Sequence, residues 1–456
     1  MNAALQMYSG FRHYDRPTAK RAVTKVSDAN AAWHAMEEHW ILIEDLSKGT
    51  TAMRKKHRTY LPQEPRELDE SYDARLVRSV CPPYLVRIER MLAGMLTRKP
   101  VRLNDTGDTI REQLFDVDLQ GNDLNAWCYE TARTMIRYGH VGVLVDAPQD
   151  GGRPYWISYS PRDILGWRTE LEDGTQKLTQ LRLREVVTEP DGDYGEKAVE
   201  QVRVLTPGAY ELHRKDDDTG DFKLHDEGTT TLDRIPFSVA YSDRVGYMES
   251  RPPLQDIAEL NLKTYQVQSD LDNQLHISAV PMLAFYGFPT SAEEVSAGPG
   301  EAIAFPAEGR AEYIEPGGRS FDYQFKRLDQ LASQINELGL AAVLGQKLSA
   351  ETAEAKRIDR SQGDSTMMVI AQNVQDMIDN CLQFHAEFLS TPEQAGSCYV
   401  NRDFLGTRLE PQDVLALLQV YTAGTITQET FLTRLAEGEV LGDDFDIEAE
   451  LEATQP

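Results

Sequence analysis

The amino-acid sequence predicts an α+β fold, and two observations carry this prediction. First, two long stretches, Leu254–Ile277 and Phe321–Leu344, read as helices. The first has no Gly or Pro over 24 residues, enough for a helix of about 36 Å. The second places apolar residues at helical spacing. Second, residues 176–242 alternate apolar and polar residues with a period of two, which is typical of a meander of antiparallel strands.

The N-terminal third mixes predicted helices and strands. Helices are expected over Ser27–Asp45, Tyr84–Thr97 and Leu124–Tyr138, and residues 60–80, which contain two prolines, are expected to form a loop. A glycine after the third helix leads into the apolar run Val141–Val145, which has the length of a buried strand. In the meander, Asp191-Gly192 and Thr219-Gly220 have the composition of hairpin turns, and the segment IPFSVAYS (235–242) is taken as its last strand.

The C-terminal half has a different pattern of residues. Residues 279–320 contain short apolar pieces separated by Gly and Pro, which indicate a small β-rich insertion between the two long helices. A long helix is expected over Ile358–Leu389, followed by a strand in SCYVNRDF (397–404) and short helices over Pro411–Tyr421 and Gln428–Ala436. Two long helices that flank a β insertion form a spike projecting from a body, which suits an assembly subunit better than an enzyme.

Composition excludes several classes of protein. The 456 residues carry 47 basic and 74 acidic side chains, a net charge of −27, which argues against a protein that binds DNA through Lys and Arg. No apolar run approaches the ~20 residues that span a bilayer, and the N-terminus has no apolar signal core, so we expect neither a membrane protein nor a secreted one. The four cysteines lie far apart and are expected to be buried, reduced thiols: Cys81, Cys128, Cys381 and Cys398.

Candidate chemical motifs do not carry catalysis. The two histidines of HAMEEH (34–39) are five residues apart, so they do not share a helical face as metal ligands do. The run Asp216–Asp218 lacks the spacing of a calcium loop and reads as a hairpin turn, and the glycine-rich AGPGEA (297–302) lacks the Lys-Ser/Thr of a phosphate cradle. We therefore expect no catalytic residue, no metal and no cofactor.

Two features are able to act without catalysis, and each has a simpler alternative. Polar residues of the first long helix follow a 3-4-3-4 spacing that places them in one stripe: Asp256, Glu259, Lys263, Gln266 and Asp270. This stripe is either a solvated helix face or, in a ring, the lining of a polar channel. The segment GQKLSAETAE (345–354) is either an ordinary connection between helices or a loop that projects into a lumen.

Several segments, in this order, resemble the portal proteins of tailed bacteriophages. The matching segments are YLPQEPRELDESYDARLVRS (60–79), RYGHVGVLVDAP with RPYWISYSPRDILGWR (137–168), IPFSVAYS (235–242), PPLQDIAELNLKTYQVQSDLDNQLHISAVPMLAFYGF (252–288), GPGEAIAFP (298–306) and YTAGTITQETFLTRL (421–435). None is as specific as a nucleotide-binding motif. Their number and order over residues 60–440 carry the resemblance.

The resemblance implies a domain organisation. Residues 1–250 would form an N-terminal arm and a mixed wing domain, 251–278 and 321–344 the two stem helices, and 279–320 the clip. Residues 345–354 would be a tunnel loop, 355–410 a long kinked helix with a further wing strand, and 411–456 a short helical crown. The crown is shorter than in larger relatives of that family.

The resemblance also implies a function. The chain would form a dodecameric ring with copies of itself at one capsid vertex of the virion, after assembly in the host cytoplasm. Its partners would be the large terminase subunit, then a head–tail adaptor protein, the major capsid protein and the passing double-stranded DNA, with no membrane. The ring would serve genome packaging and ejection. Alternatives are another ring-forming head–tail connector or adaptor, or an enzyme that processes nucleic acid or peptidoglycan.

Candidate site residues follow from this assignment. The tunnel loop would contact DNA through Gln346, Lys347, Ser349, Glu351 and Thr352. The stripe of the first long helix supplies candidates for the channel wall. The clip would contact motor and adaptor proteins through Glu293, Glu294, Glu308 and Arg310.

Overall fold

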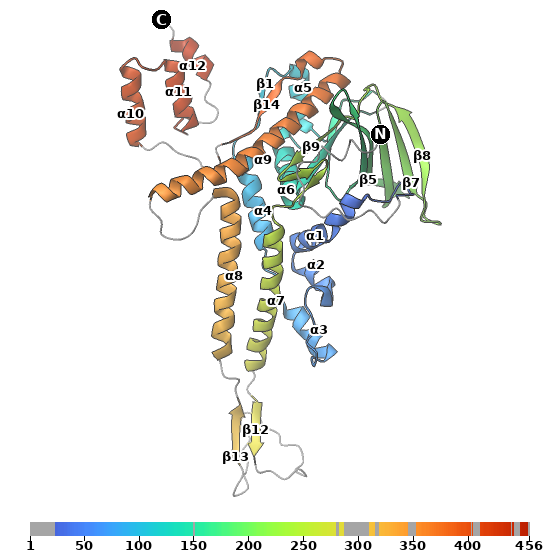
Figure 1. Cartoon of the computed structure of the whole chain (residues 1–456), viewed down its shortest axis with the longest axis vertical. Coiled ribbons are helices and arrows are strands. Elements are labelled where there is room, and N and C mark those ends of the chain that lie inside the picture. Colours follow the sequence, from blue (N-terminus) through green and yellow to red (C-terminus); the bar gives the residue numbers. More distant parts are fainter. Residues whose placement is uncertain are drawn as a thin grey trace.

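The protein has an α+β fold in which a helical stem projects from a body of helices and sheets (Figure 1). The structure is a computed structural model. It describes residues 23–148, 151–279, 282–286, 310–314, 319–344, 353–402, 404, 411–438, 440–441 and 447–454.

Six helices form the N-terminal part of the described chain. They are α1 (Ala31–Lys48), α2 (Thr50–Lys55), α3 (Asp69–Arg78), α4 (Tyr84–Leu96), α5 (Asp108–Gln113) and α6 (Leu124–Tyr138). The prediction of a loop over residues 60–80 was wrong, because α3 occupies half of it. Asp69 and Glu70 in the first turn of α3 stabilise the helix by opposing its dipole.

Helix α6 and the strand after it agree with the sequence prediction. The Asp123 side chain accepts a hydrogen bond from the Ala126 backbone N–H at 2.7 Å and so caps the start of the helix. The helix ends at Gly139, whose φ of 99° is one that L-residues with a side chain rarely adopt. The chain then enters strand β2 (His140–Asp146), which is buried along nearly its whole length.

The body contains two larger antiparallel sheets. One has the strand order β3-β2-β9, with β3 (Tyr155–Tyr159) and β9 (Phe237–Tyr241) on either side of β2. The other has five strands in sequence order: β4 (Ile164–Glu172), β5 (Thr175–Asp191), β6 (Gly195–Thr206), β7 (Ala209–Lys215) and β8 (Phe222–Thr229). The predicted turns are confirmed by positive φ at Gly192 and Gly220. Strand β9 was wrongly assigned to the meander, since it pairs with β2 instead.

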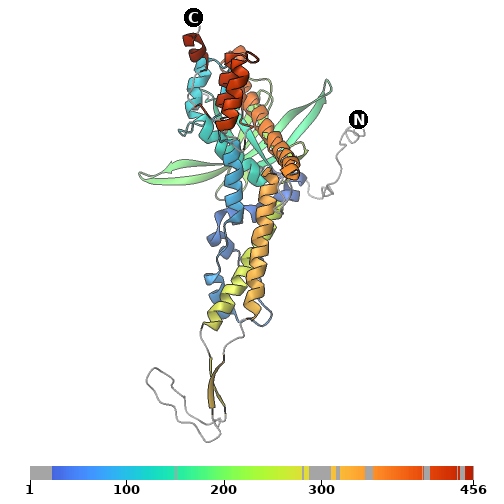
Figure 2. The same ribbon diagram turned by 90° about the vertical axis from the view of Figure 1, so that its left-hand side faces the viewer.

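The stem consists of two antiparallel helices joined at the far end by a pair of strands. Helix α7 (Gln255–Ser278) leads to β12 (Met282–Tyr286), and β13 (Arg310–Ile314) leads back to α8 (Arg319–Leu344). The strands pair from Met282 opposite Ile314 to Tyr286 opposite Arg310. Figures 1 and 2 show this hairpin at the tip, remote from the body. The predicted spike is thus present in the described residues.

Helix α9 (Ala353–Phe388) crosses the top of the stem and packs over β2 and β9. It is one uninterrupted helix, so the predicted kink does not break it, and it starts five residues earlier than predicted. Its buried face includes Met367, Val374 and Cys381, which are seven residues apart and so lie on one side of the helix. After α9, β14 (Ser397–Tyr399) pairs with β1 (Arg102–Asn104).

The C-terminal segment contains three helices: α10 (Pro411–Thr422), α11 (Gln428–Glu437) and α12 (Ile447–Thr454). Thr427 caps α11 by accepting a hydrogen bond from the Thr430 N–H at 3.2 Å. Helix α12 was not predicted. The division of the chain into wing, stem, clip and crown stays a prediction.

The core of the body lies between α4, α6, α9 and the β2 sheet. Trp156 of β3 is fully buried there, with its ring 5.1 Å from that of Trp127. All four cysteines are free and buried, as expected, and burial raises the pKa of the Cys81 and Cys128 thiols to about 12. These thiols are therefore poor nucleophiles at neutral pH.

Candidate functional site: an assembly surface on the stem

Helix α8 has one face that packs within the chain. Leu331 and Ile335 are fully buried, and Gly339 lies one turn further along the same face. A Cβ atom added at Gly339 would lie 2.8 Å from Ile88 of α4, so only glycine lets α8 approach α4 this closely without a shift. This contact fixes the height of α8 relative to the body.

Most of the other described side chains of α8 are exposed, and they include large apolar ones. Tyr323 is 75% exposed, Phe325 48% and Leu338 40%. Tyr323 and Leu338 lie on one flank of the packed face, and Phe325 lies on the other flank, since it is about 200° from Tyr323 around the helix. Burial of apolar area is worth roughly 25 cal/mol per Å², so covering these side chains would be favourable. They form a candidate contact surface for another protein.

The polar stripe predicted on α7 does not form one free face in the structure. Asp256, Glu259 and Lys263 are exposed, and Asp256 lies 3.6 Å from Arg251. Gln266 instead donates a hydrogen bond to the Tyr60 carbonyl at 3.0 Å. The lower part of the stripe thus contacts the N-terminal helices of the same chain, and its role as a channel wall stays a prediction.

Asp270, the last residue of the stripe, lies beside the buried Arg75 of α3. The Arg75 Nη1 is 3.6 Å from the Asp270 carboxylate and donates to Ser269 Oγ at 3.3 Å. Burial raises the pKa of Asp270, while Arg75 opposes this shift. The hydrogen bond from Arg75 lowers the pKa of Glu67, which lies 2.8 Å away. These contacts of Arg75 hold α3 against α7.

Sequence reasoning missed Arg75 as an organising residue. Its guanidinium joins Glu67, the Pro62 carbonyl and the stem helix, which are brought together only by the folded chain. The only local signal was the position of Arg75 on the buried face of α3. A charged side chain there requires partners.

The tunnel-loop candidates (Gln346, Lys347, Ser349, Glu351 and Thr352) lie outside the described residues. So do the clip candidates Glu293, Glu294 and Glu308, and the AGPGEA segment. Arg310 is described: it starts β13, lies 3.7 Å from Glu312, and its guanidinium carbon is 4.8 Å from the centre of the Tyr286 ring. Its contacts are therefore within the hairpin.

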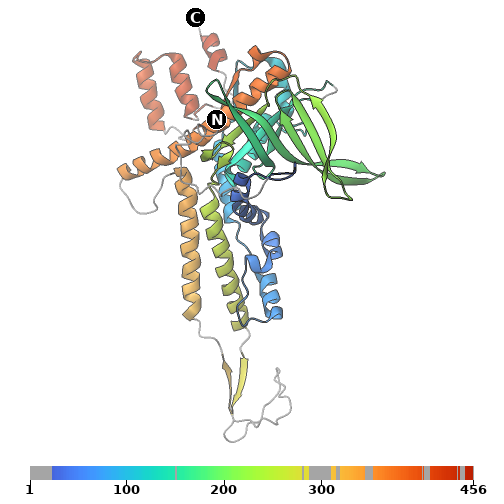
Figure 3. The same cartoon turned by 45° about the vertical axis from the view of Figure 1, so that its right-hand side comes forward.

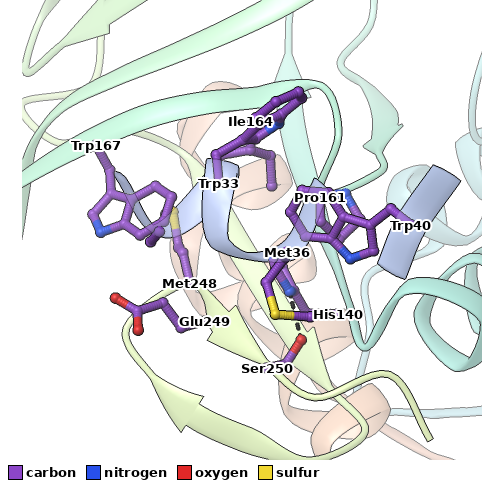
Figure 4. A pocket seen from close by; sticks show the side chains of 11 residues that line it. Trp33, Met36, Trp40, His140, Pro161, Ile164, Trp167, Met248, Glu249 and Ser250 are labelled. Carbon is purple, nitrogen blue, oxygen red and sulfur yellow. Dashed lines mark hydrogen bonds between the residues drawn. The ribbon is translucent and has the colours of Figure 1, made fainter. Parts of the chain in front are cut away.

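A pocket in the body is too small for an organic ligand. Its volume of about 10 Å³ leaves room for about one water molecule, and its wall includes Trp33, Met36 and Met248 (Figure 4). His140 and Ser250 also line it and share a hydrogen bond of 2.7 Å. Burial lowers the pKa of His140 to about 3, so this imidazole is neutral at physiological pH. The pair reads as a satisfied buried contact.

The remaining motifs have structural surroundings. His34 lies 3.3 Å from Glu37 on α1, and Asp216 accepts from the Thr219 N–H at 2.9 Å in the turn between β7 and β8. Within the described ranges, no group of three or more metal-ligating side chains comes together. No helix in this part of the chain has the length and apolar character that a membrane crossing requires.

Comparison with known families locates one match in the chain. A family model described as "Domain of unknown function (DUF4055)" matches residues 253–389. This segment begins just before α7 and ends just after α9, so it contains the whole stem, the hairpin and the helix above them. No curated protein matches the chain significantly.

Solved structures with some similarity come from gene transfer agent (GTA) particles. A chain from "Virion of native gene transfer agent (GTA) particle" has 9% identity and a TM-score of 0.44, covering 85% of this chain and 98% of that chain. A chain from "Neck of empty GTA particle computed with C6 symmetry" has 11% identity and a TM-score of 0.41, covering 78% and 90%. One from "Neck of native GTA particle computed with C12 symmetry" has 10% identity and a TM-score of 0.41, covering 82% and 94%. Since every TM-score is below 0.5, these similarities by themselves assign neither fold nor function.

Proposed function

We propose that the chain is a portal-like subunit that assembles into a closed ring, with twelve copies surrounding a channel for double-stranded DNA at one capsid vertex. The observation that carries the proposal is the stem. Two long helices project from the body, carry a β-hairpin at their tip, and expose large apolar side chains along α8. The order of sequence segments that resembles phage portal proteins supports the same assignment.

The exposed face of α8 favours a ring over a symmetric dimer. A head-to-tail contact uses two different surfaces of each copy, and repetition of that contact closes into a ring when the rotation allows it. The stem presents two different flanks, with α8 on one side of α7 and α3 on the other (Figures 1 and 3). Each copy therefore has a surface for each of two neighbours.

The charge of the chain suits a conduit. With a net charge of −27, the chain as a whole repels phosphates, which would let a duplex slide without being trapped. In this proposal, the hairpin end of the stem docks the large terminase subunit during packaging and a head–tail adaptor protein afterwards. The body contacts the major capsid protein, and the ring performs no reaction of its own.

Ring formation is tested on the purified full-length protein. We expect negative-stain images to show rings with a central hole, and mass photometry at physiological salt to show a species of roughly twelve times the 51.4 kDa chain. A single species at the monomer mass over the whole concentration range would refute the proposal.

The conduit role needs a second test in phage. Deleting residues 347–353 spares α8 and removes only the first residue of α9. We therefore expect normal rings but shortened or poorly retained genomes, because this segment is proposed to touch the passing DNA. Normal rings that hold full-length, stably retained genomes would contradict the role of this loop.

A further inference from the structure

The two flanks of the stem carry exposed charges of opposite sign at matching heights. In Figure 2, α8 lies along one edge of the stem, and α3 and α4 lie toward the other. Figures 1 and 3 show α7 between α8 and α3. The two edges are therefore separate surfaces of one copy.

On the α8 edge, exposed basic side chains lie in the lower part and an exposed acidic one lies in the upper part, while the exposed Asp322 and Asp329 lie further round the lower half of the helix. Lys326 and Arg327 lie in the half of the helix near the hairpin, and Glu337 lies near its other end. All three are exposed, and none makes an ion pair with another described residue. At 100° per residue, Tyr323, Arg327 and Leu338 fall on the same flank of the helix.

On the other edge, the order of charge is reversed. The outer face of α3 presents Glu70 and Asp73, beside Val77, whose side chain is 68% exposed. Above it, the outer face of α4 presents Arg87 and Arg90. These four charged groups also have no ion-pair partner within the described part of the chain.

Contacts with α7 and α8 set the heights of these groups. Arg75 and Ser79 of α3 contact Ser269 of α7, nine residues before α7 ends at Ser278. Because α8 starts at Arg319 and runs antiparallel, this level corresponds to about residue 328 of α8, next to Lys326 and Arg327.

Two contacts fix the height of Arg87 and Arg90 along the stem. The Leu85 N–H of α4 donates to Asn261 of α7 at 3.0 Å, seventeen residues before the end of that helix, which corresponds to about residue 336 of α8. Independently, Ile88 of α4 meets Gly339 of α8. Arg87 and Arg90 therefore lie at the level of Glu337.

We propose that the α8 edge of one subunit docks on the α3–α4 edge of the next. This inference rests on the proposed ring, because a rotation without translation brings together only surfaces at equal height. Lys326 and Arg327 then face Glu70 and Asp73 of the neighbour, and Glu337 faces its Arg87 and Arg90. Tyr323 covers the neighbour's Val77, which removes apolar surface of both from water.

A complementation experiment tests this pairing with two charge-reversed variants. K326E/R327E makes the lower part of the α8 edge acidic, and E70K/D73K makes the α3 face basic. Each variant alone opposes like charges at every contact, so we expect at least a tenfold higher concentration for half-maximal ring formation. Mixed in equal amounts, they form rings in which the two variants alternate, because every contact then joins opposite charges.

Two controls separate the interface from general effects of charge and folding. R168E/K177E changes the same charge on the five-stranded sheet, and we expect rings at the wild-type concentration. A double-cysteine variant, V77C/Y323C, should give covalent oligomers on oxidation, while V77C and Y323C alone stay monomeric on a non-reducing gel. The native cysteines are buried and do not compete.

The outcomes separate this inference from the proposed function. If wild-type rings form but both charge-reversed variants also form them normally and V77C/Y323C gives no covalent oligomers, the interface is wrong and the ring stands. If the wild-type protein forms no ring, both are wrong. Recovery of rings only on mixing supports the pairing, and failure of the mixture to recover while each variant unfolds at the wild-type temperature overturns it.

Discussion

The body and the stem bury different kinds of side chain. In the body, the residues between α6, α9 and the β2 sheet are almost all apolar, with Trp156 and Met135 fully excluded from water. Along α7, by contrast, the buried face includes polar residues such as Asn261, Thr264 and Ser269. Apolar burial supplies stability in proportion to area, whereas a buried polar group contributes only when its partner is correctly placed.

The contrast indicates different tasks for the two regions. The body folds around its own core. The stem is held in register by specific hydrogen bonds and leaves apolar side chains of α8 exposed. In the proposed ring, neighbouring subunits would cover the part of the stem that one chain leaves exposed.

The largest expected effect is in the body core. Trp156→Ala removes a fully buried indole whose N–H donates to His385 at 3.3 Å, joining β3 to α9. We expect a loss of about 3–5 kcal/mol in the free energy of unfolding, measured by urea titration. A loss below about 1 kcal/mol would show that the core is not continuous between these elements.

A buried ion cluster gives the next effect. The fully buried Glu89 of α4 accepts from Arg133 at 2.9 Å and from Arg137 at 2.7 Å, both on α6. Glu89→Gln leaves two arginines without their shared carboxylate, so we expect a loss of about 3 kcal/mol. The exposed Glu130→Gln, which touches only Arg133 of this pair, is the matched control and should change stability by less than about 1 kcal/mol.

The sequence predicted features that depend on neighbouring residues and missed those that depend on residues far apart in the chain. Helix α6 was predicted with its correct bounds because its cap at Asp123 and its stop at Gly139 are local. Strand β9 was placed in the wrong sheet because alternation reveals a strand but not its partner. Its pairing of Tyr241 with His140 spans about a hundred residues.

The stripe on α7 was limited in a similar way. Helical spacing correctly places Asp256 through Asp270 along one side of the helix. It carries no information about what covers that side. The chain folds back so that Tyr60 and Arg75 contact Gln266 and Asp270, and this return path is a tertiary property.

In the stem, the buried hydrogen bonds between α7 and the start of α4 are tested at Asn261. Its side chain accepts from the Leu85 N–H at 3.0 Å and donates to the Pro82 carbonyl at 2.9 Å. Asn261→Ala leaves both backbone groups unpaired in a buried place, and we expect a loss of about 2 kcal/mol in unfolding experiments. If Asn261→Leu proved as stable as the wild type, the packing of α7 against α4 would not depend on these hydrogen bonds.

Acid should weaken the body through two buried histidines. Burial lowers the pKa of His140 to about 3 and that of His385 to about 4, well below the ordinary value of 6.5. Below pH 6.5 the unfolded chain therefore binds more protons than the folded one, so stability falls as the pH drops from about 6.5 toward 4. The maximum slope is about 1.4 kcal/mol per pH unit for each histidine.

Substitution separates this effect from the protonation of carboxylates. His140→Asn should reduce the slope of unfolding free energy against pH between 6 and 4 by about 1 kcal/mol per unit, whatever its effect on stability at pH 7. The same substitution at the exposed His225 serves as the control. Equal slopes for wild type and His140→Asn would mean that His140 is protonated in the folded state as readily as in the unfolded one.

The smallest effect on folding is expected at Tyr323, and there the contrast between the two regions is sharpest. This side chain is 75% exposed and lies on a helix whose packed face is elsewhere. Tyr323→Ser should therefore change the free energy of unfolding of the isolated chain by less than about 0.5 kcal/mol, in urea titrations at low protein concentration. The same substitution removes apolar area that the proposed contact buries at every subunit boundary, so it should raise the concentration needed for ring formation severalfold. A destabilised monomer would instead place Tyr323 among the residues that hold the fold, and its exposure would no longer point to a neighbour.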